Sequence, residues 1–330
     1  MKILFIHQYL STFIKKDLEI LKEKHEVREV VFRGKLAPLK VLRNIFWCDI
    51  AFCWFGKLNA FFAILFGKVL GKKIIVVAGD DDVTNAIVNG RPYGLCSHPI
   101  KKYFAYFIFS MVDLILPVSE YSYGETIANA KADPKKVKTI LHGFDSDLFK
   151  KQVTVKKMPV VATIANINNE NYYRKGLNLF VETARKISYV DFIIIGPVFD
   201  VKVARRLLDG APPNLKLIGP RFSQDLVDIL SSVSVYVQAS EWESFCCAVA
   251  EAMLCECVPI VSKNAALPEV VGSAGLYLDR LSSDELAEKI KDAFNHPELG
   301  KIVRQRILEN FPLSKRRDAL LKAVETMEGR

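Results

Sequence analysis

The sequence has few of the features that mark disulfide frameworks, metal sites or zinc modules. Its 330 residues include five histidines, and its seven cysteines are an odd number with no C-x-x-C pair. Cys246-Cys247 and Cys255-x-Cys257 lie within apolar stretches, where cysteine behaves as a small buried side chain. We therefore expect a reduced, intracellular protein without a disulfide framework or a bound metal.

Long apolar runs are missing as well. Residues 41–78 are very apolar, but charged side chains interrupt them; these are Arg43, Asp49, Lys57, Lys68, Lys72 and Lys73. No run approaches the roughly 20 apolar residues that a membrane span needs, and the run after Met1-Lys2 is too short for a secretory signal. We expect a cytoplasmic protein, and peripheral attachment to the inner membrane face stays open.

Positive charge is in excess but is not concentrated. The formal net charge is +9, spread over short pairs such as Lys101-Lys102 and Lys156-Lys157. A basic balance suits nucleic acid, an anionic membrane surface or phosphorylated small molecules, and it also suits a plain lysine-rich surface. No RNA-binding aromatic motif or zinc module accompanies the charge, so we expect no nucleic-acid partner.

Short apolar, β-branched segments alternate with helical patterns through the whole chain. Strands are predicted at residues 2–6, 27–32, 49–55, 73–78, 113–118, 160–165, 191–195, 215–218, 233–238 and 259–262. This alternation predicts an α/β fold with two doubly wound, Rossmann-like domains built on parallel sheets. We place the first domain at residues 1–152 and the second at 153–312, and expect a helix at 313–330 that packs back on the first.

The loop and helix from Ser240 to Met253 carry the sharpest pattern. A polar loop leads into a helix of small and apolar residues, and Glu243 and Glu251 frame its start. Eight helical steps span about 12 Å, comparable to the distance between ribose and sugar in a nucleotide sugar. A helix start suits a diphosphate, and ribose hydroxyls would satisfy a carboxylate in an apolar helix. The plainer alternatives are an acid favoured near a helix start and an exposed helix glutamate.

Other segments accompany this one in a fixed order, and together they resemble family 4 glycosyltransferases of the GT-B fold, the large retaining class. The resemblance covers almost the whole chain. The segments that carry it are Val118-Ser119, Leu141 to Phe149, Lys175-Gly176, Leu215 to Gly219 and Ser240 to Val271. GT-B enzymes have two such domains facing a cleft.

The resemblance implies a role for each matching residue. Glu251 would bind the ribose hydroxyls, Glu243 would contact the donor sugar, and Lys175 would neutralise the diphosphate as charge develops on it. Phe245, Cys246 and Cys247 would supply backbone N–H groups, and Gly219 would precede the base-binding loop. The implied reaction retains anomeric configuration, needs no metal or other cofactor, and moves a sugar, such as a hexose, from a UDP- or GDP-sugar to a glycan, lipid-linked or small-molecule hydroxyl.

The sequence departs from the family pattern at several positions. Asn166 stands where the family usually has a phosphate-binding arginine, and Arg174 is either its replacement or a solvated loop charge. Usual glycine positions are occupied by Ser244, Cys246, Glu256, Ala265 and Ala266. If close approach to the phosphate needs glycine, the donor pocket is reshaped, so the sugar stays open.

Two candidates for acceptor-side chemistry lie in the first domain. Asp80, Asp81 and Asp82 follow the fourth strand, and adjacent carboxylates raise one another's proton affinity. Asp80, nearest the strand end, is the first candidate for proton acceptor; metal binding and a solvated acidic loop are the alternatives. His7, at the end of strand one and facing the cleft, is the second, with a structural histidine as the alternative.

Three further alternatives stay open. The same fold would serve a nucleotide-sugar epimerase or a sugar-phosphate processing enzyme. The replaced arginine and glycines would also suit a nucleotide-sugar binding protein without transferase activity. The apolar, aromatic and basic segment 99–111 suits a lipid-linked or membrane-proximal acceptor, or is simply a core helix.

Overall fold

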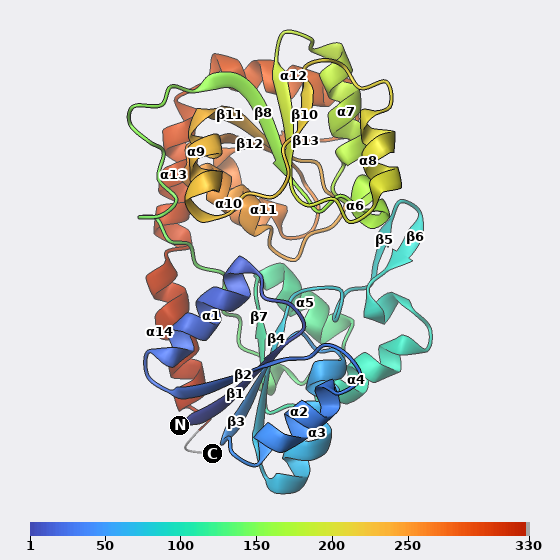
Figure 1. Ribbon diagram of the computed structural model, residues 1–330, viewed down its shortest axis with the longest axis vertical. Helices are drawn as coiled ribbons and strands as arrows, with labels where there is room; N and C mark the ends of the chain where they lie inside the picture. The colour runs from blue at the N-terminus through green and yellow to red at the C-terminus, as the bar shows by residue number, and fades with distance from the viewer. Residues whose placement is uncertain (328–330) are drawn as a thin grey trace. The chain divides into compact units, whose positions relative to one another are not determined.

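A computed structural model describes residues 1–327, which form two compact units (Figure 1). Unit 1 comprises Met1–Gly143 and the chain from Leu313 onward, and unit 2 comprises Phe144–Pro312. The boundary between the two units lies after Gly143, nine residues before the boundary at residue 152 that the sequence predicts. The reason is that the Phe144 N–H donates to the Phe311 carbonyl at 2.9 Å and the Phe144 ring stacks on Phe245.

Unit 1 is a parallel sheet in the order β2-β1-β3-β4-β7. Its strands are β1 (Lys2–His7), β2 (Glu26–Val31), β3 (Ile50–Trp54), β4 (Lys73–Ala78) and β7 (Leu114–Pro117). Its helices are α1 (Thr12–Lys22), α2 (Ala37–Ile45), α3 (Leu58–Gly67), α4 (Lys101–Met111), α5 (Glu120–Ala128) and α14 (Leu313–Glu325). A two-stranded hairpin, β5 (Ala86–Val88) with β6 (Arg91–Tyr93), follows β4. The helices α2, α3 and α4 share one core with the sheet, so they cover a single face of it.

The helix α14 joins unit 1 through one buried ion pair. The guanidinium of Arg316 donates to both carboxylate oxygens of Asp17 on α1, each at 2.7 Å, and also to the carbonyls of Ile140 and Leu141. Both side chains of the pair are buried. A charge pair removed from water is stable only with such complete hydrogen bonding, so α14 occupies one defined position on α1.

Unit 2 is a parallel sheet in the order β10-β9-β8-β11-β12-β13. Its strands are β8 (Met158–Ile164), β9 (Asp191–Ile195), β10 (Leu215–Leu217), β11 (Val233–Gln238), β12 (Val258–Ser262) and β13 (Leu276–Leu278). Its helices are α6 (Asn169–Arg174), α7 (Leu177–Lys186), α8 (Val201–Leu208), α9 (Ser223–Ser232), α10 (Cys247–Leu254), α11 (Leu267–Val271), α12 (Ser283–Asn295) and α13 (Leu299–Asn310). In such sheets ligands bind at the carboxyl ends of the strands.

The predicted fold class is confirmed: both sheets are parallel and each is wound with helices. The strands predicted from short apolar runs are present, with bounds that shift by one or two residues. Within residues 1–327, no helix is both long and apolar enough to cross a membrane.

Candidate functional site

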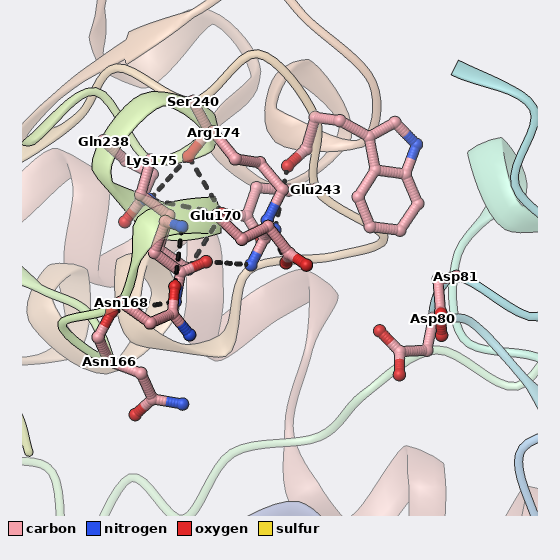
Figure 2. A network of polar contacts seen from close by, with 12 residues as sticks. Asp80, Asp81, Asn166, Asn168, Glu170, Arg174, Lys175, Gln238, Ser240 and Glu243 are labelled. Atoms are coloured by element: carbon pink, nitrogen blue, oxygen red, sulfur yellow. Dashed lines mark hydrogen bonds and ion pairs between the residues drawn. The ribbon is translucent and has the colours of Figure 1, made fainter. Parts of the chain in front are cut away.

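A polar network fills the carboxyl end of β11 and the loop that follows it (Figure 2). The carboxylate of Glu243 is its centre. Its Oε1 atom accepts hydrogen bonds from Lys175 Nζ at 2.9 Å, Ser240 Oγ at 2.9 Å and Gln238 Nε2 at 3.2 Å. Its Oε2 atom lies 3.7 Å from Arg174 Nη1. Two cations predicted to bind phosphate are therefore held by the predicted sugar-binding glutamate.

The network continues into the sheet along one face of β11. The Tyr236 hydroxyl donates to Gln238 Oε1 at 2.9 Å, and Gln238 Nε2 donates to Ser240 Oγ at 2.7 Å. All three side chains are buried. Alternate residues of a strand share a face, so this row of polar groups leads directly from the sheet interior to Glu243.

Glu243 is ionised in this setting. Burial alone would raise the pKa of its carboxyl, but Lys175 and Arg174, with the hydrogen bonds from Lys175 and Ser240, outweigh burial and hold the pKa below its ordinary value. A buried carboxylate with several donors on one oxygen is a rigid group. It fixes the positions of Lys175 and Arg174 as well as its own.

Arg174 is not a solvated loop charge. It ends α6, and its side chain is only 11% exposed. Its Nη2 atom donates to Asn171 Oδ1 at 2.7 Å, while Asn171 Nδ2 donates to the Asn166 carbonyl at 2.9 Å. The exposed Asn166, which stands at the family's arginine position, is thus linked to Arg174 through a single amide.

Gly176 brings Lys175 against β11. Gly176 adopts φ +67° at the start of α7, and a Cβ there would lie 2.5 Å from the Ala239 carbonyl oxygen. No other residue would allow this approach without displacing the backbone. Gly219, after β10, also has a left-handed φ of +70°, which keeps the loop after it turned sharply.

Helix α10 begins directly after Cys246, which is in the left-handed region with φ +78°. The buried Phe245 ring packs against Phe144 and Phe311, so its side chain belongs to the core of unit 2. Burial, and then Glu243, raise the pKa of the Cys246 thiol to about 12, so the thiol is neutral. Cys247 is the first residue of the helix, where backbone N–H groups have no partner within the helix.

Glu251 lies on α10 among buried residues, including Val249, Ala252 and Met253. Glu251 itself is half-buried. Burial raises the pKa of its carboxyl to about 8, and no donor among residues 1–327 offsets that effect. Burial also raises the pKa of Tyr236, and the charges of Glu243 and Glu251 add to that effect. Both glutamates therefore border the same buried phenol, and of the two only Glu243 has a hydrogen-bond donor within residues 1–327.

In unit 1 the three aspartates after β4 have unequal environments. Asp80 forms an ion pair with Lys57 Nζ at 2.9 Å, and Asp81 pairs with the same ammonium. Asp82 is fully buried and accepts hydrogen bonds from the backbone N–H groups of Gly56, Gly79 and Asp80. Burial is the main cause that raises the pKa of Asp82 to about 7. Asp82 thus organises the loop, while Asp80 and Asp81 present charge beside Lys57.

His7, the second candidate for proton acceptor, is less accessible than Asp80 and Asp81. Its side chain is fully buried, and Nε2 lies 2.8 Å from Glu29 Oε1 on β2. His7 ends β1, which is an inner strand between β2 and β3. This placement favours a structural histidine.

Sequence reasoning missed Gln238, Ser240, Asn171 and Lys57. A signal existed for the first two: polar residues alternate at 234, 236, 238 and 240 in an otherwise apolar inner strand, where parallel sheets normally continue apolar. Lys57 follows β3 as Asp80 follows β4, and these strands pair in the sheet. Within residues 1–327, no group of three or more His, Cys, Asp or Glu side chains is arranged to hold a metal ion.

Known proteins resemble unit 2 in sequence and the whole chain in fold. Residues 158–296, all in unit 2, match the family model described as glycosyl transferases group 1. A phosphatidylinositol N-acetylglucosaminyltransferase subunit from Arabidopsis thaliana is 24% identical over 195 residues. That match covers 57% of this chain and 43% of the Arabidopsis protein, so the chain spans less than half the length of this relative.

Solved structures resemble the chain over its whole length. HepE from Anabaena in complex with UDP-glucose superposes with a TM-score of 0.79 at 16% identity, covering 99% of this chain and 100% of HepE. Sucrose-phosphate synthase from Thermosynechococcus elongatus superposes with a TM-score of 0.82 at 14% identity, covering 100% and 99%. The chain has the GT-B fold of these glycosyltransferases, and its unit 2 carries the sequence pattern of glycosyl transferases group 1.

Proposed function

We propose that this chain is a glycosyltransferase that binds a nucleotide-diphosphate sugar on unit 2 and moves the sugar to an acceptor hydroxyl. The observation that carries the proposal is Glu251, a half-buried carboxyl in an apolar helix that receives no donor from the described part of the chain. Such a group is costly unless a ligand satisfies it. A pair of ribose hydroxyls supplies two hydrogen bonds of the required kind.

The phosphate site follows from the residues around Glu251. Lys175 and Arg174 are held next to the start of α10 by Glu243. A diphosphate at that helix start would meet two cations and the positive end of the helix dipole. The same groups would stabilise the charge that develops on the diphosphate as the glycosidic bond breaks.

The finer assignments belong to the same proposal. We expect retention of anomeric configuration, transfer without a bound metal, and UDP as the first nucleotide to test, since HepE binds UDP-glucose. Glu243 would orient the cations in addition to its predicted contact with the sugar. Asp80, beside Lys57, is kept as the acceptor-side candidate. We expect a hexosyl donor and a cytoplasmic location.

Titration calorimetry with UDP, GDP and ADP tests the proposal. One of these nucleotides should bind the wild-type chain, and Glu251→Ala should weaken its binding about 100-fold, because two hydrogen bonds between ribose and the carboxyl are lost. Glu241→Ala, in the same loop, serves as the matched control and should retain most of the affinity. If none of the three binds, or both variants bind equally well, the donor site is wrongly assigned.

A binding protein without transferase activity is the second candidate. It is favoured by Cys246, which has a left-handed backbone at a position where the sequence resemblance predicts glycine. Binding with no turnover on any donor would support it.

A further inference from the structure

The helices α2, α3 and α4 form one basic and apolar face of unit 1, and this face does not belong to the site described above. They neighbour one another in that order (Figure 1) and pack on the sheet through a shared core. Their inward residues include Val41, Ala63 and Ile108, which are fully buried. The opposite sides of the same helices are therefore the outer surface of unit 1.

That outer surface is apolar where a surface helix is normally polar. On α3 and the turn after it, Leu58, Leu65 and Val69 are exposed, with Val69 85% exposed. Ile100, which precedes α4, and Tyr103 and Phe107 on α4 are also exposed, spaced three and four residues apart as on one face of a helix. An amphipathic helix has one apolar stripe, whereas α3 and α4 have a second one that faces outward.

The two stripes join into one surface. The ring of Phe61 on α3 lies 5.6 Å from that of Phe104 and 5.9 Å from that of Phe107 on α4. Of the 25 large apolar side chains exposed in residues 1–327, eleven lie on α2, α3, α4 or the residues that flank them. Exposed apolar side chains are ordinary when scattered, but a contiguous patch marks an interaction surface.

The charge of this face has one sign. None of the three helices contains Asp or Glu, whereas Lys40, Arg43, Lys101 and Lys102 lie on α2 and α4. Three of these four, Lys40, Arg43 and Lys101, are exposed. Helix α1, on the rest of unit 1, mixes signs with Lys15, Lys16, Asp17 and Glu19. An apolar surface rimmed by cations is complementary to a layer that is negative outside and apolar within.

We propose that the face formed by α2, α3 and α4 docks unit 1 onto an anionic lipid bilayer. The exposed apolar stripes enter the headgroup boundary, and the lysines and arginine contact lipid phosphates. A second copy of the chain is a poorer occupant, because a two-fold contact would bring this positive charge against itself. The proposal is independent of the transferase assignment, since the face contains none of the donor-site residues.

Co-sedimentation of the full chain with vesicles tests this directly. We expect binding to phosphatidylcholine vesicles containing about a third phosphatidylglycerol and little binding to phosphatidylcholine alone. Each cation near an anionic surface strengthens binding about fivefold, so Lys40→Glu/Lys101→Glu should reduce it by at least about 30-fold. Leu65→Ser/Phe107→Ser should also abolish most of it.

Matched controls lie on other surfaces. Lys15→Glu/Lys22→Glu changes the net charge equally on α1, and Phe199→Ser/Leu208→Ser removes two exposed apolar side chains of unit 2. Both controls should bind vesicles like the wild type, and circular dichroism should show all four variants folded. Equal loss in controls and face variants would overturn the proposal. So would no binding to anionic vesicles, or concentration-dependent dimerisation that only the face variants abolish.

Discussion

Glu251 is the residue on which the functional assignment depends most. Its helix offers it apolar neighbours and no donor, and burial raises the pKa of its carboxyl to about 8. A position that costs stability in the unliganded protein is typical of binding sites. Glu243 is its opposite: it is buried, but its Oε1 accepts three hydrogen bonds and Arg174 lies beside its Oε2, so it keeps its charge. The two glutamates thus have different chemistry, although the sequence spacing treats them alike.

Glu251→Gln should change the pH dependence of stability. Because the pKa of Glu251 is raised on folding, the folded state holds a proton that the unfolded state has lost, and stability falls as pH rises from about 4.5 to about 8. Glutamine does not titrate, so the stability of the variant does not fall in this pH range for that reason. It should match the wild type near pH 4 and be more stable by up to about 5 kcal/mol above pH 8, measured by urea unfolding at a series of pH values. A constant difference at all pH values would contradict the assignment.

Backbone strain is a second residue-scale feature of unit 2. Cys246, Glu256 and Ala265 occupy positions where the family usually has glycine, and all three keep left-handed φ values, of +78°, +62° and +52°. The left-handed region costs a residue with a Cβ about 1–2 kcal/mol. The loops around α10 and α11 are therefore less stable than they would be with glycine at these positions.

Ala265→Gly should consequently stabilise the protein. Relief of the left-handed strain exceeds the added chain entropy of glycine, which gives a net gain of about 0.5 kcal/mol. The adjacent Ala266→Gly is the matched control, because Ala266 has an ordinary helical φ of −81° and should lose about 1 kcal/mol. Opposite signs in thermal unfolding are the expected result, and equal signs would contradict it.

At the scale of elements, the strands were predictable and several helices were not. Inner strands such as β4 and β12 are uninterrupted apolar runs, and burial alone identifies them. The short surface helices α8 and α9 were missed because packing on the sheet stabilises them more than any local signal does. The β5–β6 hairpin was also missed, although Asn89-Gly90 between its strands is a strong turn pattern.

The site divides in the same way. Glu243 and Glu251 could be proposed because one loop-to-helix pattern carries both, and Lys175 because it precedes Gly176 in a second recognisable segment. The partners Gln238 and Asn171 could not, because their role depends on which atoms meet after β11 and α6 have packed. The pairing of Lys57 with Asp80 likewise depends on the register of β3 against β4.

At the scale of the whole molecule, the C-terminal helix α14 belongs to the same unit as the N-terminal strands. The Arg316–Asp17 pair joins residues 299 positions apart within unit 1, and burial raises the pKa of Asp17 despite the opposing charge of Arg316. Removal of one partner leaves a buried carboxyl without its counterion, a larger loss than that of any surface pair. The stability of unit 1 therefore depends on the far end of the sequence.

Arg316→Ala should destabilise the protein by about 3–5 kcal/mol, because Asp17 and two backbone carbonyls lose their donor. Arg317→Ala is the matched control: Arg317 pairs with Glu23, and both side chains are 42% exposed, so its loss should cost less than about 1 kcal/mol. Denaturant titration of both variants measures the contrast. Similar small effects would show that α14 contributes little to unit 1.

The release of sugar from a nucleotide-sugar donor without acceptor is the most direct test of the proposed function. Followed by proton NMR with the nucleotide that binds, wild-type protein should slowly release free sugar, first in the anomeric form of the donor, as retention requires. Glu251→Ala and Lys175→Ala should each slow the release by about 100-fold or more. Tight nucleotide binding with no release from any donor, or release unaffected by both substitutions, would contradict a transferase centred on Glu243 and Glu251.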